Sequence, residues 1–389
     1  MGSDIIYTIL RDYGEIGIAI GVAVLVLFVA QIVLQLLVYG RIASFRLTNK
    51  KQIRETEPAI SIIVPLFAED YTYLDTSLVN LLTQDHNEFE VVLVYVGNNN
   101  DFFEDVKSLQ RVYPHLNPVQ ICCSPFYPVS LKIALNVGIK SAKHDFILTT
   151  SSDATPTSNR WLSLLAKGFI YGDIVLGYSG IAHQGGFKNF IFRSYKFSNA
   201  MAWISAIIRR RPYSSSHNAF GFTKELYFNA RGFNHLDMDY GVEDLFLQEI
   251  ATPDNVSVVL APRATCTERT WGGWRWWWFQ ARRDYSTHHF YKRWAMAFSK
   301  AELYVRFLFF LAIIAIVVLT PWSAWQIKAT ALGIALLRYF FALFVMVRNT
   351  RRLGEKGLIG LYFIYDFVEP VLRFFIAIVP YKNSSNRGN

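Results

Sequence analysis

The sequence predicts an α/β domain inserted between transmembrane α-helices. Three observations lead to this fold class. The 389 residues are 52% apolar, with a mean hydropathy of +0.22, which is more than a soluble domain usually needs. Long apolar runs lie near both ends of the chain. Between them, residues 57–300 alternate short apolar runs with helical stretches, the pattern of a largely parallel sheet covered by helices.

The first predicted span runs from Ile16 to Tyr39, a segment without charged residues. At about 1.5 Å per residue it is long enough to cross a hydrocarbon core of about 30 Å. Acidic residues precede it, unlike the basic start of a cleaved signal peptide. The residues that follow it are basic, so the positive-inside rule places the next domain in the cytoplasm and the N-terminus outside. These basic residues are Arg41, Arg46, Lys50, Lys51 and Arg54.

A second hydrophobic block begins near Leu303. It contains three candidate spans, Phe307 to Ile327, Ala329 to Val347 and Leu358 to Pro380. The loop between the last two is rich in arginine and lysine, and we therefore expect it in the cytoplasm. The chain would then cross the membrane four times, with both termini outside.

Charged residues inside this block need an explanation. Asp366, Glu369 and Arg373 share one helical face, so the last segment could lie along the membrane interface instead of crossing. Arg338 lies in the middle of the third span, where a lone charge costs at least about 2.5 kcal/mol. We expect Asp366 or Glu369 to pair with it. Such a pair could simply fasten two helices, or it could mark a site for a lipid phosphate.

Charge and cysteine content narrow the class of partner. The formal charge of +9 suits an anionic membrane surface or a phosphate-bearing substrate better than nucleic acid, because the chain also carries membrane spans. The three cysteines have neither the even count of a disulfide scaffold nor a metal-binding spacing. We expect Cys122, Cys123 and Cys266 to be buried apolar residues.

The central region predicts strands at Ile60 to Leu66, Val91 to Val96 and Phe146 to Thr150. Helices are predicted at Tyr73 to Thr83 and Leu131 to Ala142. Sheets of this kind bind ligands beyond the carboxyl ends of their strands. The functional residues should therefore lie in the loops that follow each strand.

Acidic residues occupy several of these positions. Glu69 and Asp70 follow the first strand, where they could also be ordinary residues at a helix N-terminus. Asp153 follows the third strand, and could coordinate a divalent metal that holds a diphosphate or could cap a turn. Glu243 and Asp244 open an apolar helix, a common place for capping acids. In a partly dry cleft, a carboxylate there could also take a proton from an acceptor hydroxyl.

The segment 271–283 carries five tryptophans in eight positions. Tryptophan prefers the headgroup level of a membrane, so we predict an interfacial helix here. Arg282 and Arg283 follow the tryptophans. They could anchor the helix among headgroups, or donate forked hydrogen bonds to a pyrophosphate leaving group.

Taken in this order, the motifs resemble the family 2 inverting glycosyltransferases over about residues 58–295. Ile60 to Asp70 is similar to that family's opening strand and loop, and Lys132 to Ile139 to its lysine, Ala-Leu-Asn, Gly pattern. His217 to Phe233 resembles its acceptor-side segment. The resemblance implies a GT-A domain, a Rossmann-like mixed sheet covered by helices. It also implies a nucleotide-sugar donor, usually bound with a divalent cation, Mg or Mn.

The resemblance further implies residue roles. Glu243 and Asp244 match the Glu-Asp pair whose Asp is the base, and Gln280 with Arg283 matches the closing Gln-x-x-Arg. On the donor or diphosphate side we place Pro65, Glu69, Lys132, Asp153, Gln280, Arg282 and Arg283, with Asp153 as the metal ligand. On the acceptor side we place His217, Asn218 and Trp278.

Three departures from the family pattern matter. Ser151 replaces the first acid of the Asp-x-Asp metal motif, which leaves Asp153 alone. Tyr95 and Val96 stand where an Asp pair usually holds the nucleotide base. Asp284 replaces the Trp of chain-extending synthases, which favours a single transfer over a processive polysaccharide synthase. The missing acids leave a third hypothesis, a catalytically dead relative that binds saccharide or scaffolds a membrane complex.

The sequence therefore predicts inverting transfer of a sugar to a lipid or polyprenyl-linked acceptor at the cytoplasmic face of the inner (plasma) membrane. Such a reaction would serve the synthesis of cell-envelope polysaccharide or glycolipid. We divide the chain into an N-terminal transmembrane helix with a basic linker (1–56), a GT-A domain (57–270), an interfacial Trp-rich segment (271–300) and C-terminal transmembrane helices (301–389).

Overall fold

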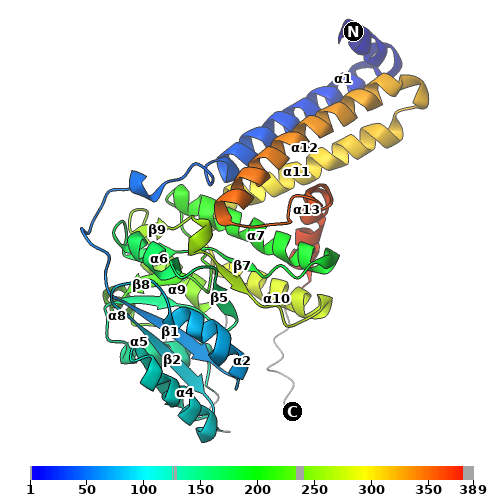
Figure 1. Cartoon of the computed structure of the whole chain (residues 1–389). Helices are drawn as coiled ribbons and strands as arrows, with labels where there is room; N and C mark the ends of the chain where they lie inside the picture. The colour runs from blue at the N-terminus through cyan, green and yellow to red at the C-terminus, as the bar shows by residue number, and fades with distance from the viewer. Residues whose placement is uncertain (1, 125, 127–128, 234–240, 380–389) are drawn as a thin grey trace.

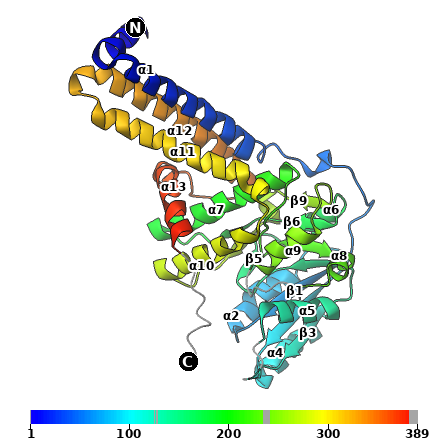
Figure 2. The ribbon, with the colours of Figure 1, turned by 180° about the vertical axis from the view of Figure 1, so that it is seen from behind.

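The computed structural model describes residues 2–124, 126, 129–233 and 241–379. A bundle of three long helices stands on an α/β domain (Figure 1). The bundle comprises α1 (Gly2–Gln35), α11 (Arg293–Leu319) and α12 (Trp325–Leu353). Three more helices lie between the bundle and the sheet, and Figure 2 shows the same arrangement from behind. They are α7 (Gly186–Ile208), α10 (Trp274–Ser286) and α13 (Tyr362–Ile378).

The described residues of the α/β domain form a seven-stranded mixed sheet in the order β3-β2-β1-β4-β8-β6-β9. Strand β8 runs antiparallel to both of its neighbours, and the other pairings are parallel. This architecture confirms the predicted fold class. The strands are β1 (Ile60–Leu66), β2 (Phe89–Val96), β3 (Leu116–Ile121), β4 (Phe146–Thr149), β6 (Ile174–Leu176), β8 (Phe220–Thr223) and β9 (Val256–Val258).

A smaller sheet lies beside the first, with strand order β5-β10-β7. Its strands are β5 (Ala154–Pro156), β7 (Ser179–Ile181) and β10 (Cys266–Glu268). The remaining helices are α2 (Tyr71–Tyr73), η3 (Leu74–Leu78), α3 (Val79–Leu82), α4 (Asn100–Val112), α5 (Leu131–Ser141), α6 (Trp161–Phe169), α8 (Lys224–Asn229) and α9 (Val242–Ile250). Short helical turns are η1 (Leu36–Gly40), η2 (Leu47–Asn49), η4 (Pro262–Ala264), η5 (Thr287–Phe290) and η6 (Trp322–Ala324).

Both faces of the large sheet are covered, which explains why strands such as β1 are buried along their whole length. One face packs against α5, and its core continues through α7, α9 and α10 to the foot of the bundle. The other face packs against α2 to α4 and α6. Because the parallel strands β1, β2 and β4 end at one edge, the loops that follow them lie together.

Three helices are long and apolar enough to cross a membrane: Ala19–Gly40, Trp294–Leu319 and Trp322–Leu353. They contact one another through a small apolar cluster, while many of their other side chains are exposed. The second span begins and ends earlier than predicted. It stops at Leu319 because Pro321 lacks a backbone N–H and disfavours a helical residue before it.

The fourth predicted span is not among these candidates. Helix α13 has 17 residues and lies beside α7 and α10 instead of joining the bundle (Figure 1). Its charged face is buried against its neighbours, with Asp366 and Glu369 almost inaccessible. The structure thus favours the alternative in which this segment does not cross. Pro380, the predicted end of the span, lies outside the described residues.

The cysteine prediction was wrong for two of three residues. Cys266 is buried in β10, but Cys122 and Cys123 are exposed. They follow β3, the outermost strand of the large sheet, and no further strand covers them among the described residues.

Candidate active site

On the donor side, Glu69 is held by the loop that follows β2. Its Oε1 accepts a hydrogen bond from the hydroxyl of Tyr95 at 3.2 Å, and its Oε2 accepts one from Nδ2 of Asn99 at 2.7 Å. Pro65 lies earlier in the same strand, paired with Val94 and buried. An exposed carboxylate therefore stands at the carboxyl edge of β1, where the sequence predicts a donor-binding residue.

Tyr95 itself faces the core. It is 1% exposed and packs against Phe102, with ring centroids 5.0 Å apart. Its hydroxyl lies directly beneath Gly97, which leaves no room for a Cβ atom at that position. The polar residues that β2 offers to the cleft are therefore Asn98 and Asn99, one turn beyond the position of the missing Asp pair.

Asp153 is bonded to the segment that leads into α10. Its Oδ1 accepts a hydrogen bond from Nε1 of Trp271 at 2.8 Å, and its carbonyl oxygen accepts one from the N–H of Arg269 at 3.0 Å. The guanidinium of Arg269 also lies 3.6 Å from the carboxylate of Asp70. Residues 269–271 thus join the loops after β1 and β4. Sequence analysis missed Arg269 and assigned Trp271 to the membrane interface.

His217 and Asn218 connect that loop to the acidic pair of α9. Asn218 accepts a hydrogen bond from the N–H of Ser151 at 3.0 Å and donates one to Glu268 at 2.6 Å. Burial alone would raise the pKa of Glu268, but its ion pair with Lys196 outweighs burial and lowers it. Glu268 therefore stays charged beside Asn218, a residue that no sequence motif revealed.

Glu243 and His217 form an ion pair, with Oε2 and Nδ1 3.1 Å apart. Burial would raise the pKa of Glu243, but the charge of His217 and then that of Arg283 lower it. Burial would likewise lower the pKa of His217, but Glu243 and Asp244 raise it to about 9. The pair is thus an imidazolium and a carboxylate at neutral pH. Glu243 is 5% exposed whereas the His217 side chain is 41% exposed, so the cation faces solvent.

Asp244 is buried and held on both oxygens. Its Oδ1 accepts hydrogen bonds from the N–H of Ser215 at 2.8 Å and the hydroxyl of Ser214 at 3.0 Å. Its Oδ2 accepts one from the hydroxyl of Tyr291. Burial raises the pKa of Asp244 although all these donors lower it. A carboxylate whose pKa is raised toward neutrality is better suited to take a proton than an exposed one.

The backbone before α9 brings these acids into place. Gly241 has a φ of 67°, in the left-handed region that favours glycine. A Cβ atom there would lie 2.5 Å from Cγ2 of Thr287. The chain can therefore pass close to η5, and this close approach brings Tyr291 to Asp244.

Helix α10 is fixed through Trp277, which is 5% exposed and stacks on Phe192 of α7 with ring centroids 5.0 Å apart. Trp278 packs against Trp277 and is half-buried. Gln280, Arg282 and Arg283 lie on the following turn and are also half-buried. Of these, Arg283 is near enough to lower the pKa of Glu243.

Lys132 lies in the first turn of α5, at the edge where the parallel strands end. A helix N-terminus and a lysine are both favourable for phosphate oxygens. Its contact with a diphosphate remains a prediction.

The donor set at Asp153 fits a nucleotide-bound cation of limited coordination. No group of three metal-binding side chains occurs among the described residues. Oxygen Oδ1 of Asp153 is oriented by Trp271, and Oδ2 has no hydrogen-bond partner in the described part of the chain. A single carboxylate together with diphosphate oxygens and water is a common set for Mg²⁺.

Comparison with known proteins points to one class. Residues 23–170, less than half of the chain, match the model of glycosyl transferase family 21. None of the curated proteins matches the chain. Among solved structures, it resembles the mannosyltransferase PcManGT from Pyrobaculum calidifontis in complex with GDP-Man and Mn²⁺. The two share 16% identity and a TM-score of 0.52, over 87% of this chain and 100% of that one.

A second structure, residues 1–349 of TarS from S. aureus, shares 16% identity over 83% of this chain and 93% of its own. Its TM-score of 0.39 is too low to add to the argument. The family match and the glycosyltransferase fold support a glycosyltransferase. Three candidate spans also support an association with membranes.

Proposed function

We propose that this protein transfers a sugar from a nucleotide-sugar to a hydroxyl group of a lipid or polyprenyl-linked acceptor, with inversion at the anomeric carbon. The observation that carries this proposal is the environment of α9. A buried, hydrogen-bonded Asp244 stands next to a Glu243–His217 ion pair, and residues 217–218 connect that pair to the loop of Asp153. A base and a donor loop thus belong to one continuous set of contacts.

In the proposed reaction, Asp244 takes the proton of the acceptor hydroxyl. Oxygen Oδ2 accepts one listed-free lone pair's worth of bonding only from Tyr291, so it retains capacity for a second hydrogen bond. The acceptor oxygen then attacks the anomeric carbon while the bond to the diphosphate breaks, and the diphosphate leaves with the bonding electrons. Glu243 orients this end of the site through its pair with His217.

The leaving diphosphate gains negative charge and needs cations. Lys132, Arg282 and Arg283 are the candidates from the sequence, and Arg269 is added by its position between Asp70 and Asp153. A divalent cation, when bound, would screen the diphosphate charge, and Asp153 is the residue that would hold it. The manganese and GDP-mannose of the similar mannosyltransferase support both a cation and a nucleotide-sugar donor.

A lipid acceptor is proposed from the position of the domain. Helix α10 contacts α13, which in turn contacts α11 of the bundle. Exposed Trp271 and Trp274 lie near the beginning of α10, on the same side of the molecule as these contacts. A hydroxyl presented at the bilayer surface would therefore reach this region most easily. We place the catalytic domain at the cytoplasmic face of the inner membrane, following the basic residues that flank the spans.

Replacing the base tests the mechanism. Purified protein in detergent is incubated with a panel of nucleotide-sugars and total lipid extract, and the new glycolipid is identified by mass. We expect Asp244→Asn to lower transfer by at least about 100-fold, the usual contribution of a general base, with donor binding within a few-fold. Asp254→Asn, at an exposed acid, is the matched control. Retained turnover in Asp244→Asn would reject Asp244 as the base.

A binding protein without activity is the second candidate, because Ser151 and Tyr95 replace acids that the resembling family uses. Calorimetry with uridine and guanosine diphosphate sugars, with and without manganese, separates the two. Measurable donor affinity supports the enzyme, whereas no affinity for any donor favours the inactive relative. A processive synthase would be recognised by long products in the same assay.

A further inference from the structure

A cavity lies where the bundle meets the catalytic domain. Its walls come from the end of α1 with η1, from α7, and from α11, α12 and α13. Gln35, Ser194, Arg306, Tyr365 and Glu369 contribute polar groups, and Met201 and Ala342 are among its apolar residues. The cavity has an empty volume of about 410 Å³, part of which is open to its surroundings. It therefore stands apart from the candidate active site on α9.

Four residues that line the cavity carry a buried polar atom without a hydrogen-bond partner in the described part of the chain. They are Gln35, Ser194, Arg306 and Tyr365. The atoms concerned are an amide oxygen, a hydroxyl, a guanidinium Nε–H and a phenol. Each residue is at most 3% exposed. Such groups are rare in folded proteins, and several around one cavity indicate a polar occupant.

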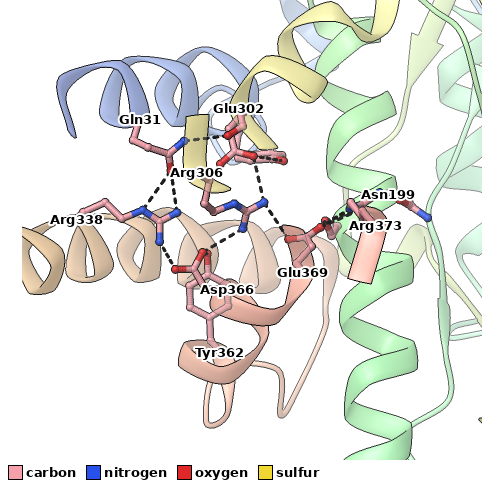
Figure 3. A network of polar contacts seen from close by, with 11 residues as sticks. Gln31, Asn199, Glu302, Arg306, Arg338, Tyr362, Asp366, Glu369 and Arg373 are labelled. Carbon is pink, nitrogen blue, oxygen red and sulfur yellow. Dashed lines mark hydrogen bonds and ion pairs between the residues drawn. The ribbon is translucent and has the colours of Figure 1, made fainter. Parts of the chain in front are cut away.

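The charges around the cavity argue against an anion as this occupant. Figure 3 shows Arg306, Arg338 and Arg373 joined to three carboxylates. Arg306 contacts Glu302, Asp366 and Glu369, Arg338 contacts Asp366, and Arg373 contacts Glu369. Three cations and three anions cancel, and Glu369 itself lines the cavity. A phosphate would meet a carboxylate there instead of a free cation.

The unpartnered atoms instead match a neutral group that both donates and accepts. The Nε–H of Arg306 can only donate, the amide oxygen of Gln35 can only accept, and the hydroxyls of Ser194 and Tyr365 can do either. We propose that this cavity binds a neutral hydroxyl group, supplied by water or by the polar end of an uncharged lipid. The occupant would complete the polar contacts between the bundle, α7 and α13.

The sign of a stability change tests the proposal. Removing a buried hydroxyl that has no partner is neutral or stabilising, whereas removing one that is hydrogen-bonded is destabilising. We expect Tyr365→Phe and Ser194→Ala each to lower the melting temperature of the detergent-solubilised protein by about 2 °C or more. An unchanged or higher melting temperature in both variants would overturn the proposal.

Tyr73→Phe is the matched control. The hydroxyl of Tyr73 is also buried and without a hydrogen-bond partner among the described residues, but Tyr73 packs under the catalytic sheet, away from this cavity. We expect its melting temperature to stay the same or to rise. A fall equal to that of Tyr365→Phe would show that loss of any buried phenol destabilises the protein, and the proposal would then fail.

Added lipid distinguishes the two sources of the hydroxyl. If a lipid supplies it, diacylglycerol should raise the melting temperature of the wild type in proportion to its concentration, and should raise that of Tyr365→Phe less. If water supplies it, diacylglycerol should leave both unchanged while the variants keep their lower melting temperatures. Both results support the proposal, because both require the destabilised variants.

Discussion

At the scale of single residues, the central feature is a carboxylate held from three separate parts of the chain. Ser214 and Ser215 precede Asp244 by about 30 residues, and Tyr291 follows it by 47. Burial favours the protonated form while each of these donors favours the charged form. The balance sets the pH at which Asp244 can act as a base.

Tyr291→Phe tests that balance. Losing the hydrogen bond to Oδ2 removes a group that lowers the pKa of Asp244, so its pKa should rise. Because a base must be deprotonated, we expect the acidic limb of the kcat/KM profile to move to higher pH, with the largest loss at low pH. Transfer rates measured across the pH range check this.

Tyr213→Phe serves as the control for that profile, because its ring packs against Tyr291 at a centroid distance of 5.7 Å while leaving the bond to Asp244 intact. We expect its acidic limb to stay close to that of the wild type. An unshifted limb in Tyr291→Phe would contradict the role given to this hydroxyl.

Sequence reasoning reached the acids at this scale but not their partners. Glu243 and Asp244 are adjacent and form a local motif. Tyr291 belongs to no motif, and its role follows only from the close passage of η5 beside Gly241. Trp271 was assigned to the membrane from composition, and the bond to Asp153 was visible only once the two loops were brought together.

At the scale of elements, a buried charge network fastens α13 to the bundle. Arg338 of α12 pairs with Asp366 and also receives the amide oxygen of Gln31 from α1 (Figure 3). Arg373 reaches Ser198 and Asn199 of α7. The prediction that Arg338 needs a partner is confirmed, with Asp366 in that place. Its contacts support the fastening role over a lipid phosphate site.

Charge balance in this network gives an element-scale prediction. Arg338→Leu leaves an excess negative charge in a buried site, and breaking such pairs costs roughly 3–5 kcal/mol. Adding Asp366→Asn removes the excess charge. We therefore expect the double variant to melt at a higher temperature than Arg338→Leu alone. Thermal unfolding in detergent measures both.

Lys328→Leu is the control for this pair, since Lys328 lies near the beginning of the same helix, over the ring of the exposed Trp322. We expect it to change the melting temperature little. If the double variant were less stable than Arg338→Leu, neutrality of the network would not be what holds α13 in place.

At the scale of the whole molecule, the three candidate spans and the α/β domain define two environments for one chain. The spans end near Gly40, begin near Trp294 and end at Leu353, all at the foot of the bundle beside α7. Basic residues Arg41, Arg348 and Arg351 are exposed at this end. Their position favours a cytoplasmic catalytic domain.

The native cysteines allow a test of this orientation. Cys122 and Cys123 are exposed on the catalytic domain, whereas Cys266 is buried and burial raises the pKa of its thiol. We expect a membrane-impermeant maleimide to label the protein only after the cells are permeabilised. The Cys122→Ser, Cys123→Ser double variant should then lose the label. Labelling of intact cells would place the domain outside.

The sequence by itself determined the α/β class, the long apolar helices and the acidic pair of α9, because these depend on residue type and periodicity over short stretches. Tertiary structure alone decided that α13 leaves the bundle, that Trp271 serves Asp153, and that Tyr291 and Ser214 hold Asp244. Each of these contacts joins residues far apart in the chain. Their formation depends on how the helices and strands pack, which no local pattern encodes.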